Sequence, residues 1–173
     1  MPEGIHFEER WVPFPRSISD EARALMVAMV GPDGVPVKVR TSPEPDDFDG
    51  WVAHKETVNA GMREIYRQYA PFLPATVETR TVDGVTVHIA TPTNTEAVDP
   101  SRVFLAFHGG ALYAGGGDLA LIDTQLQAVR FGVTCWGVDY RTPPEDPYPA
   151  ALDDGVAVYR ALLADHDPGH IIV

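Results

Sequence analysis

The sequence has very little cysteine and no surplus of positive charge. Cys135 is the only cysteine among 173 residues, so no disulfide can form within one chain. Lysine and arginine total 13 against 25 aspartates and glutamates, which gives a formal charge of −12. Such a surface repels nucleic-acid phosphates and anionic membranes. These shortages argue against a nucleic-acid-binding protein and favour a small, uncharged molecule as the ligand.

Long apolar runs are also missing. No stretch approaches the ~20 apolar residues of a membrane span, and residues 1–10 lack the basic segment and apolar run of a signal peptide. We therefore expect a soluble, cytoplasmic protein with no membrane partner. Cys135 lies in the apolar run 133–138, where a thiol is most simply a small buried hydrophobic side chain and not a reactive group.

Residues 1–50 combine proline-rich stretches with one amphipathic helix. The polar and acidic run 19–21 is a typical helix start, and Gly31-Pro32 ends the pattern. Between them, apolar residues at helical spacing predict a helix that packs on another element: Leu25, Met26, Met29 and Val30. Residues 35–49 have little periodicity, which indicates a loop.

The middle of the chain predicts a helix followed by a β-hairpin. An apolar stripe runs through residues 51–69 at helical spacing: Val58, Met62, Ile65, Tyr66 and Tyr69. Residues 76–82 and 85–90 then alternate β-branched and polar side chains on either side of Asp83-Gly84. An Asp-Gly pair in this setting is typical of a tight hairpin turn.

Strands and helices alternate after Pro100. Apolar strands are expected at 103–107, 133–138 and 171–173, with helices at 118–131 and 149–164 between them. Apolar strands separated by helices indicate a mostly parallel sheet covered on both faces, so with the hairpin the chain predicts a mixed α/β sheet. Residues 171–173 have the composition of a buried central strand with parallel neighbours on both sides. We therefore expect the chain to stop within a domain.

A glycine-rich loop, residues 107–118, connects a predicted strand to a predicted helix. Ligands of such folds bind at the carboxyl ends of the parallel strands. Adjacent glycines lack Cβ atoms, so their backbone N–H groups can approach a ligand atom closely. Two such donors aimed at one point stabilise the negative oxygen that develops in acyl transfer, by ~3–4 kcal/mol per donor.

Two segments of the chain resemble esterases of the hormone-sensitive-lipase group, bacterial family IV, which have the α/β-hydrolase fold. The loop sequence His108-Gly109-Gly110-Ala111 is similar to the H-G-G-G-type oxyanion loop, with alanine in the fourth position. Residues 139–154 resemble the group's D-Y-R-L-A-P-E motif, although Thr142 and Pro143 replace Leu-Ala. This second segment is expected to be structural, with Arg141 paired with one of its acids.

The resemblance covers residues 51–173 and, more loosely, the N-terminal helix. It implies that residues 1–50 are a cap segment and that 51–173 are the N-terminal half of the catalytic domain, ending at the strand before the nucleophile elbow. The backbone N–H groups of Gly109, Gly110 and Ala111 would form the oxyanion hole, and His108 would brace the loop without acting as a base. Side chains of the cap and the loop would line the substrate pocket: Trp11, Phe14, Met26, Leu112 and Tyr113. For the cap side chains, ordinary helix packing is an equally good explanation. No cofactor or metal is implied.

The family's chemistry needs a serine on a G-x-S-x-G elbow, a histidine and an acid, and this sequence contains no such elbow. Its serines are Ser17, Ser19, Ser42 and Ser101. We expect a carboxylic ester hydrolase for small acyl esters whose Ser-His-Asp/Glu triad lies beyond Val173, on a C-terminal polypeptide that completes the fold. The chain alone would be inactive. Assembly into homo-oligomers is left open.

Two other classes of protein are left open by the sequence. The first is a nucleotide-binding half-domain, which has the same order of strand, glycine-rich turn, helix and second strand with an acid at its end, here Asp139. The G-x-G-x-x-G motif of such domains is absent. A truncated, non-catalytic interaction protein would keep the sheet, and its unpaired edge would need a partner. A metal site at His166 and His170 is disfavoured, because Pro168-Gly169 breaks the helix that would align them.

Overall fold

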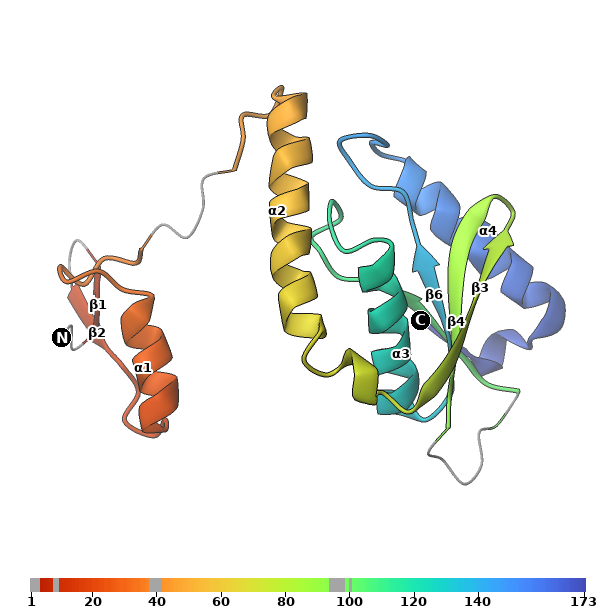
Figure 1. Ribbon diagram of the computed structural model, residues 1–173, viewed down its shortest axis with the longest axis horizontal. Coiled ribbons are helices and arrows are strands. Elements are labelled where there is room, and N and C mark those ends of the chain that lie inside the picture. Colours follow the sequence, from red (N-terminus) through yellow and green to blue (C-terminus); the bar gives the residue numbers. More distant parts are fainter. Residues whose placement is uncertain (1–3, 8–9, 38–41, 94–98, 100) are drawn as a thin grey trace. The chain divides into compact units, whose positions relative to one another are not determined.

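The computed structural model describes residues 4–7, 10–37, 42–93, 99 and 101–173 (Figure 1). The chain divides into two compact units, Met1–Ser42 and Pro43–Val173, and each is described by itself. The long first helix of the second unit begins at Phe48, and the domain boundary expected at residue 50 stays a prediction.

The first unit consists of a short hairpin and one helix. β1 (Gly4–Phe7) pairs antiparallel with β2 (Arg10–Pro13), a pairing that the sequence pattern did not predict. α1 (Asp20–Ala28) begins where expected, since Ser19 is its N-cap and the Ser19 hydroxyl accepts the Ala22 N–H at 3.2 Å.

The expected apolar stripe of α1 does not form a packed face. Leu25 and Met29 are 70% and 59% exposed, and among the four stripe residues only Val30, which follows the helix, is buried. These two side chains are therefore not covered within the first unit, and the packing of α1 on another element stays a prediction.

The second unit is built on a five-stranded sheet in the order β3-β4-β6-β5-β7. Its strands are β3 (Ala75–Val82), β4 (Val85–Pro92), β5 (Val103–Phe107), β6 (Thr134–Asp139) and β7 (Ile171–Ile172). The predicted hairpin is confirmed as β3–β4, and β4 continues antiparallel onto β6. β5 pairs parallel with both β6 and β7, so the predicted mixed sheet is confirmed, with as many antiparallel as parallel pairings.

Helices cover both faces of this sheet. α3 (Asp118–Phe131) packs on one face and α4 (Ala150–Asp165) on the other, while α2 (Phe48–Tyr66) packs against α3 (Figure 1). Two short 3-10 turns, η1 (Ala70–Phe72) and η2 (Pro168–His170), precede β3 and β7. The predicted helices at 118–131 and 149–164 are therefore confirmed to within a residue.

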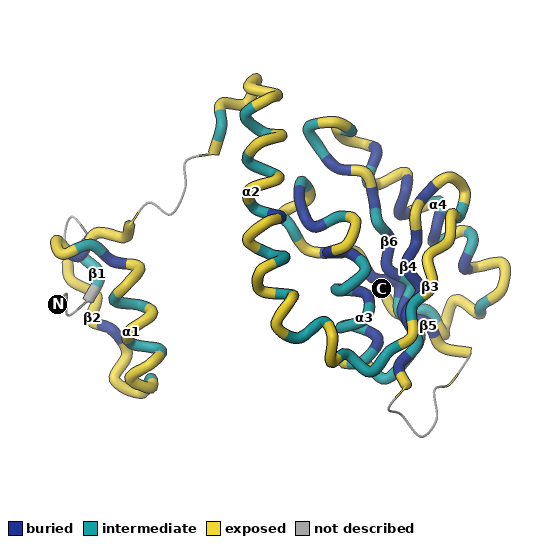
Figure 2. The backbone as a smooth tube through the Cα atoms, in the orientation of Figure 1, coloured by how far each residue is buried: buried dark blue, intermediate teal, exposed yellow. Residues whose placement is uncertain are grey.

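The two faces of the sheet have different packing. On the α4 side, branched side chains from three strands pack against branched side chains of the helix. The fully buried ones include Val87, Leu105 and Val138 from the strands and Val158 and Leu162 from α4. On the α3 side the buried residues are small: Ala90, Ala106, Ala128 and Cys135. Small side chains let the α3 backbone approach the strands closely. Buried residues concentrate on the central strands (Figure 2).

One expectation for the second unit was wrong. α2 ends at Tyr66 and not at Tyr69. Ile65 is 59% exposed, because the helix turns the buried Asn59 toward the protein and Ile65 lies well away from that face. β7 pairs parallel with β5 at the edge of the described sheet, and Ile172 is 49% exposed. The second parallel neighbour expected for this strand stays a prediction.

Among the described residues, no helix is both long enough and apolar enough to cross a lipid bilayer.

We expect native Cys135 to resist thiol reagents. The side chain is buried between α3 and the sheet, and this burial raises the pKa of the Cys135 thiol from 9.0 to about 12, with a smaller contribution from Asp123. Iodoacetamide at pH 8, followed by mass spectrometry, should leave the folded chain unmodified and label it fully in guanidinium chloride. Rapid labelling of the folded chain would contradict the burial.

The same shift predicts a pH dependence of stability. Because the pKa of Cys135 is higher in the folded than in the unfolded chain, its contribution is complete below pH 9.0 and declines as the pH rises toward 12. Relative to Cys135→Ala, the unfolding free energy of the wild type should fall by ~1.4 kcal/mol per pH unit above pH 9. Parallel pH profiles for the two proteins would contradict this.

Candidate active site

The glycine-rich loop lies between the end of β5 and the start of α3, at the carboxyl edge that β5 shares with β6. Its backbone folds back on itself through three consecutive residues with positive φ: Gly110 at 125°, Ala111 at 53° and Leu112 at 65°. A Cβ on Gly110 would overlap the Ala114 carbonyl oxygen. Glycine at position 110 is therefore required by both the dihedral angle and the space available.

This conformation leaves a row of backbone donors uncommitted. The N–H groups of Tyr113 and Ala114 both donate to the Gly110 carbonyl, at 3.1 and 3.0 Å. The N–H groups of residues 109–112 donate to no other residue in the described part of the chain. Gly109, Ala111 and Leu112 are exposed, so these donors can meet a ligand.

Three side chains hold the loop in place, one from α2 and two from the end of β6 and the residue after it. At its start, the Tyr140 hydroxyl donates to the His108 carbonyl at 2.8 Å. Further along, the Gly115 N–H donates to Oδ1 of the buried Asn59, which comes from α2, at 2.9 Å. At its end, the Gly117 N–H donates to Asp139 Oδ1 at 2.9 Å. These anchors preorganise the donors between them, and the sequence analysis identified none of them.

His108 lies beneath the loop. Its imidazole stacks on the Tyr140 ring with the centroids 4.1 Å apart and the planes 3° apart, and Nδ1 lies 3.0 Å from the Gly109 carbonyl oxygen. The side chain is buried, and this burial lowers the pKa of His108. This position suits a residue that braces the loop.

Asp139 is enclosed at the end of β6. Burial alone would raise the pKa of its carboxyl group, but the contact with His88 and the Gly117 N–H outweigh burial and lower it. The carboxylate is thus committed to protein groups, which disfavours the role of ribose ligand that a nucleotide-binding half-domain would give it.

The segment after Asp139 is structural, as expected. The Arg141 guanidinium contacts both carboxylate oxygens of Asp154, the shortest distance being 2.7 Å. The Arg141 backbone N–H also donates to Asp154 Oδ2 at 2.8 Å. The predicted pairing of Arg141 with an acid is confirmed. Lys55 on α2 fixes the same segment through Thr142 at 2.7 Å and Glu145 at 2.8 Å.

An apolar cavity of about 600 Å³ opens beside the loop, and its lining includes Tyr113. The Tyr113 ring stacks on His54 at 5.8 Å and meets the edge of Trp51 at 5.6 Å. The rest of the lining comes from the residues just before α2, from its first turns and from the proline pair between β6 and α4: Pro45, Asp46, Phe48, Trp51, Pro143 and Pro144. Trp51 was not among the predicted pocket residues.

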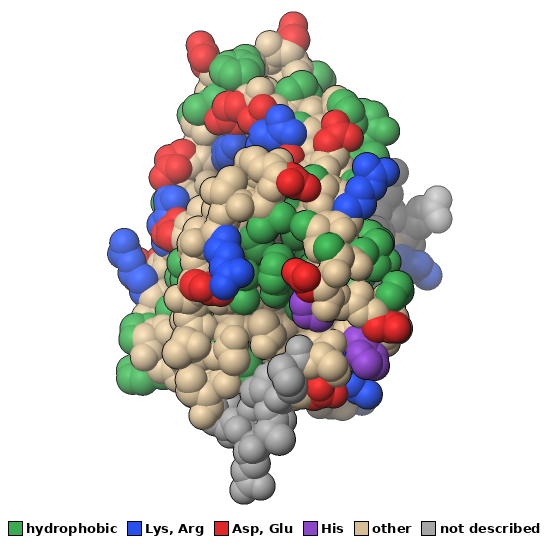
Figure 3. All heavy atoms as spheres, turned by 90° about the vertical axis from the view of Figure 1, so that its right-hand side faces the viewer, with side chains coloured by type: hydrophobic (Ala, Val, Ile, Leu, Met, Phe, Trp, Pro, Cys, Tyr) green, Lys and Arg blue, Asp and Glu red, His purple; other side chains and the backbone are tan. Residues whose placement is uncertain are grey.

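A second apolar cavity, of about 590 Å³, lies between α4 and the β5–β7 edge. It is lined by Leu105, Phe107, Leu112, Tyr140, Tyr148, Ala151, Leu152, Gly155, Val156, Tyr159 and Val173. Tyr148 is 84% exposed and Leu112 67%. Figure 3 views the molecule from the side on which α4 lies in Figure 1, and hydrophobic side chains interrupt its charged surface there.

The structure separates the sequence-predicted site residues into two groups. Gly109, Gly110, Ala111, Leu112 and Tyr113 lie together on the loop of the second unit. Trp11, Phe14 and Met26 belong to the first unit, in which Trp11 is 55% exposed, Phe14 is buried and Met26 is half-buried. A lining role for these three residues stays a prediction.

A family model, a curated protein and two solved structures that resemble this chain are all described as alpha/beta hydrolases, esterases or a hormone-sensitive-lipase homologue. Residues 103–173 match the family model of the alpha/beta hydrolase fold. Esterase LipI of Mycobacterium tuberculosis is 34% identical over 119 residues, which are 64% of this chain and 35% of that protein. The solved structure of esterase E25 superimposes with a TM-score of 0.74 at 27% identity, covering 98% of this chain and 51% of that one. EstE7, a hormone-sensitive-lipase homologue from a metagenome library, gives a TM-score of 0.56 at 30% identity and covers 76% of this chain and 46% of that one. The chain thus spans about half the length of these solved structures and a smaller part of the curated relative.

Proposed function

We propose that this chain, which has the α/β-hydrolase fold and belongs with the esterases of the hormone-sensitive-lipase group, supplies the oxyanion-binding loop of a carboxylic ester hydrolase. The observation that carries the proposal is the row of uncommitted N–H groups at residues 109–112, on a loop held by Tyr140, Asn59 and Asp139. Donors held in this way need no rearrangement when charge develops on a substrate oxygen.

The chemistry assigned to the loop is electrostatic. When a nucleophile attacks an ester carbonyl, the carbonyl oxygen becomes an oxyanion, and N–H groups of Gly109, Gly110 and Ala111 donate to it. Each donor contributes about 3 kcal/mol to lowering the barrier. His108 braces the loop from below, so it takes no proton from the nucleophile. No metal or cofactor takes part in this scheme.

The nucleophile is proposed to be a serine outside these 173 residues, activated by a histidine and an acid. Two serines of the chain have local roles: Ser19 caps α1, and the Ser101 hydroxyl donates to Asp99 at 2.6 Å. Three features support a C-terminal polypeptide that carries the triad: the half-length match to solved esterases, the exposed Ile172 on β7, and the apolar cavity along α4. The chain alone is then inactive.

The substrates are proposed to be small, uncharged acyl esters. The cavity beside Tyr113 is lined mainly by aromatic and proline side chains, and its volume of about 600 Å³ suits a small molecule. A formal charge of −12 disfavours anionic substrates. We further propose that residues 1–50 act as a cap whose Trp11, Phe14 and Met26 contribute to the pocket, and that the protein is cytoplasmic.

Active-site labelling tests this proposal. Protein captured through a tag on this chain, from cells that make it, is assayed with short-chain aryl esters and then treated with a serine-directed organophosphonate. We expect hydrolysis to stop and the label to lie on a co-purifying peptide outside residues 1–173. The isolated chain is the control and should neither hydrolyse the ester nor take the label. Hydrolysis by the isolated chain, or labelling at one of its own serines, would overturn the assignment of the triad.

A further inference from the structure

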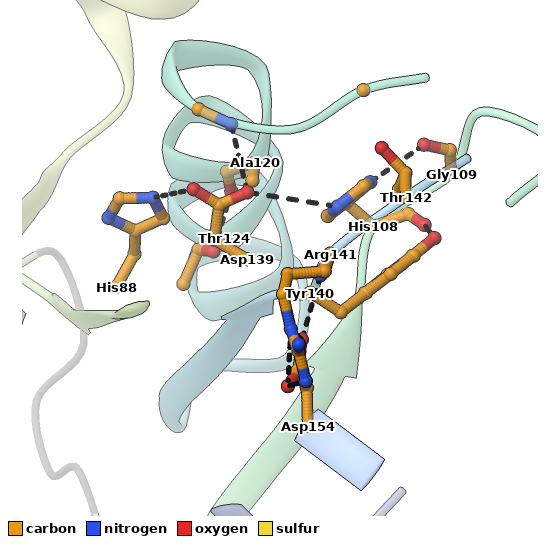
Figure 4. Close-up of polar contacts among 12 residues, drawn as sticks. His88, His108, Gly109, Ala120, Thr124, Asp139, Tyr140, Arg141, Thr142 and Asp154 are labelled. Carbon is orange, nitrogen blue, oxygen red and sulfur yellow. Dashed lines mark hydrogen bonds and ion pairs between the residues drawn. The ribbon is translucent and has the colours of Figure 1, made fainter. Parts of the chain in front are cut away.

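A half-buried carboxylate lies between two buried imidazoles behind the loop (Figure 4). Asp139 ends β6, and the two neighbouring strands supply His88, from β4, and His108, which directly follows β5. His88 Nε2 lies 3.7 Å from Asp139 Oδ2, and His108 Nε2 lies 3.9 Å from Asp139 Oδ1. The two histidines are only 5% and 6% exposed, so this cluster is part of the interior.

The other nitrogen of each ring determines what faces the carboxylate. His108 Nδ1 lies 3.0 Å from the Gly109 carbonyl oxygen, which can only accept, so Nδ1 carries the proton and Nε2 of the neutral ring has none. His88 Nδ1 lies 2.9 Å from the Thr79 hydroxyl, which can donate to it. The His88 proton is then free to sit on Nε2 and point at Asp139. Of the two rings, His88 is therefore the one whose N–H can face the carboxylate, at 3.7 Å.

We infer that His88 and Asp139 are positioning residues for the loop, His88 acting through Asp139. His88 Nε2 faces Oδ2 of the carboxylate at 3.7 Å, an electrostatic contact that is longer than a hydrogen bond, while Oδ1 accepts the Gly117 N–H at 2.9 Å. The backbone comes so close at this point that a Cβ on Gly116 would lie 2.9 Å from Oδ1. The orientation of one carboxylate thus sets where the loop ends and α3 begins.

His88 extends the support of the loop to the β3–β4 hairpin. Thr79 on β3 and His88 on β4 are direct partners in the hairpin register, so the chain of contacts runs Thr79, His88, Asp139, Gly117. The inference depends on the proposed function only for what the loop does with a substrate. The position of the loop can be measured without ester hydrolysis, so the two can fail separately.

Histidine tautomers give the first test. Long-range ¹H–¹⁵N spectra of the full 173-residue chain, labelled on histidine nitrogen, should show the proton of His88 on Nε2 and that of His108 on Nδ1. In Asp139→Asn, the remaining oxygen is needed by the Gly117 N–H, so the amide NH₂ faces His88. We expect the His88 proton to move to Nδ1, where the Thr79 hydroxyl can accept it. A purely structural role for Asp139 would not move this proton, and an unchanged His88 tautomer in Asp139→Asn would overturn the inference.

Amide exchange gives the second test. In His88→Phe the carboxylate loses the N–H group that faces it, and the Gly117 amide should exchange about tenfold faster, the change expected when its one ordinary hydrogen bond to Asp139 is lost. His88→Gln retains an N–H donor and should keep the wild-type rate. Glu78→Gln, at an exposed position of the same hairpin, is the matched control. If His88→Phe does not fold, the His88→Gln rate and the Asp139→Asn tautomer still decide. Equal Gly117 exchange in folded His88→Phe and wild type would overturn the inference.

Discussion

If the proposed function holds, Gly110→Ala is expected to lower kcat of the proposed assembled esterase by about a hundredfold or more, the effect of losing one oxyanion donor. Gly110 has a φ of 125°, where an alanine is strained, and its Cβ would overlap the Ala114 carbonyl oxygen. The loop must open to accept the methyl group. This opening moves the N–H groups of residues 110 and 111 away from their common target, while the substrate cavity beside Tyr113 keeps its lining.

Gly84→Ala is the matched control for this variant. Gly84 also has a positive φ, 85°, but a Cβ there would meet nothing within 4 Å, and the residue lies in the β3–β4 turn. It should cost about 1 kcal/mol of stability and leave kcat unchanged. Steady-state kinetics with a short-chain aryl ester measures both variants. A Gly110→Ala enzyme with wild-type kcat would remove the loop from the mechanism.

Gly137→Ala is expected to destabilise the second unit by about 3 kcal/mol, at the upper end of the usual cost of overpacking. Gly137 lies on β6 against α3, and a Cβ at this position would overlap the Thr124 hydroxyl. Thr124 is 1% exposed, and its hydroxyl donates to the Ala120 carbonyl at 2.7 Å, so its side chain has no room to turn away. The helix must therefore move off the sheet.

A second change on α3 should relieve this clash. Thr124→Ala removes the hydroxyl and methyl groups that the new Cβ would meet, so the double variant should recover part of the loss. Gly61→Ala, on α2 with nothing within 4 Å of the added Cβ, is the control and should stabilise the chain by up to ~1 kcal/mol. Urea unfolding of the wild type, Gly137→Ala, Thr124→Ala and the double variant gives the coupling energy. Additive effects of Gly137→Ala and Thr124→Ala would contradict direct contact between the two positions.

The parts of the fold that sequence could predict are those set by local pattern. Asp83-Gly84 between two alternating runs identified the hairpin, and these residues have the positive φ values, 47° and 85°, that such a turn requires. α3 begins at Asp118 and ends before Gly132, whose φ of 66° is the usual glycine stop. The loop could be found in the same way, because it lies between two such elements.

What could not be predicted depends on contacts between residues far apart in the sequence. Periodicity describes α2 as an apolar stripe, but its one buried residue is the polar Asn59, whose carbonyl oxygen accepts a loop N–H from 56 residues away. In the sequence, His88 is an ordinary strand residue. Its contact Asp139 ends β6, and no local pattern predicts that β6 lies beside β4.

The anchors of the loop also constrain the order in which the chain can fold. The β3–β4 hairpin needs only neighbouring residues, whereas the bonds from Gly117 to Asp139 and from Tyr140 to His108 span 22 and 32 residues and require β6. During synthesis the loop therefore emerges after Asn59 but before Asp139 and Tyr140, and its geometry is completed late, when β6 inserts between β4 and β5. Once residue 140 has been added, all three anchoring side chains are present in the chain.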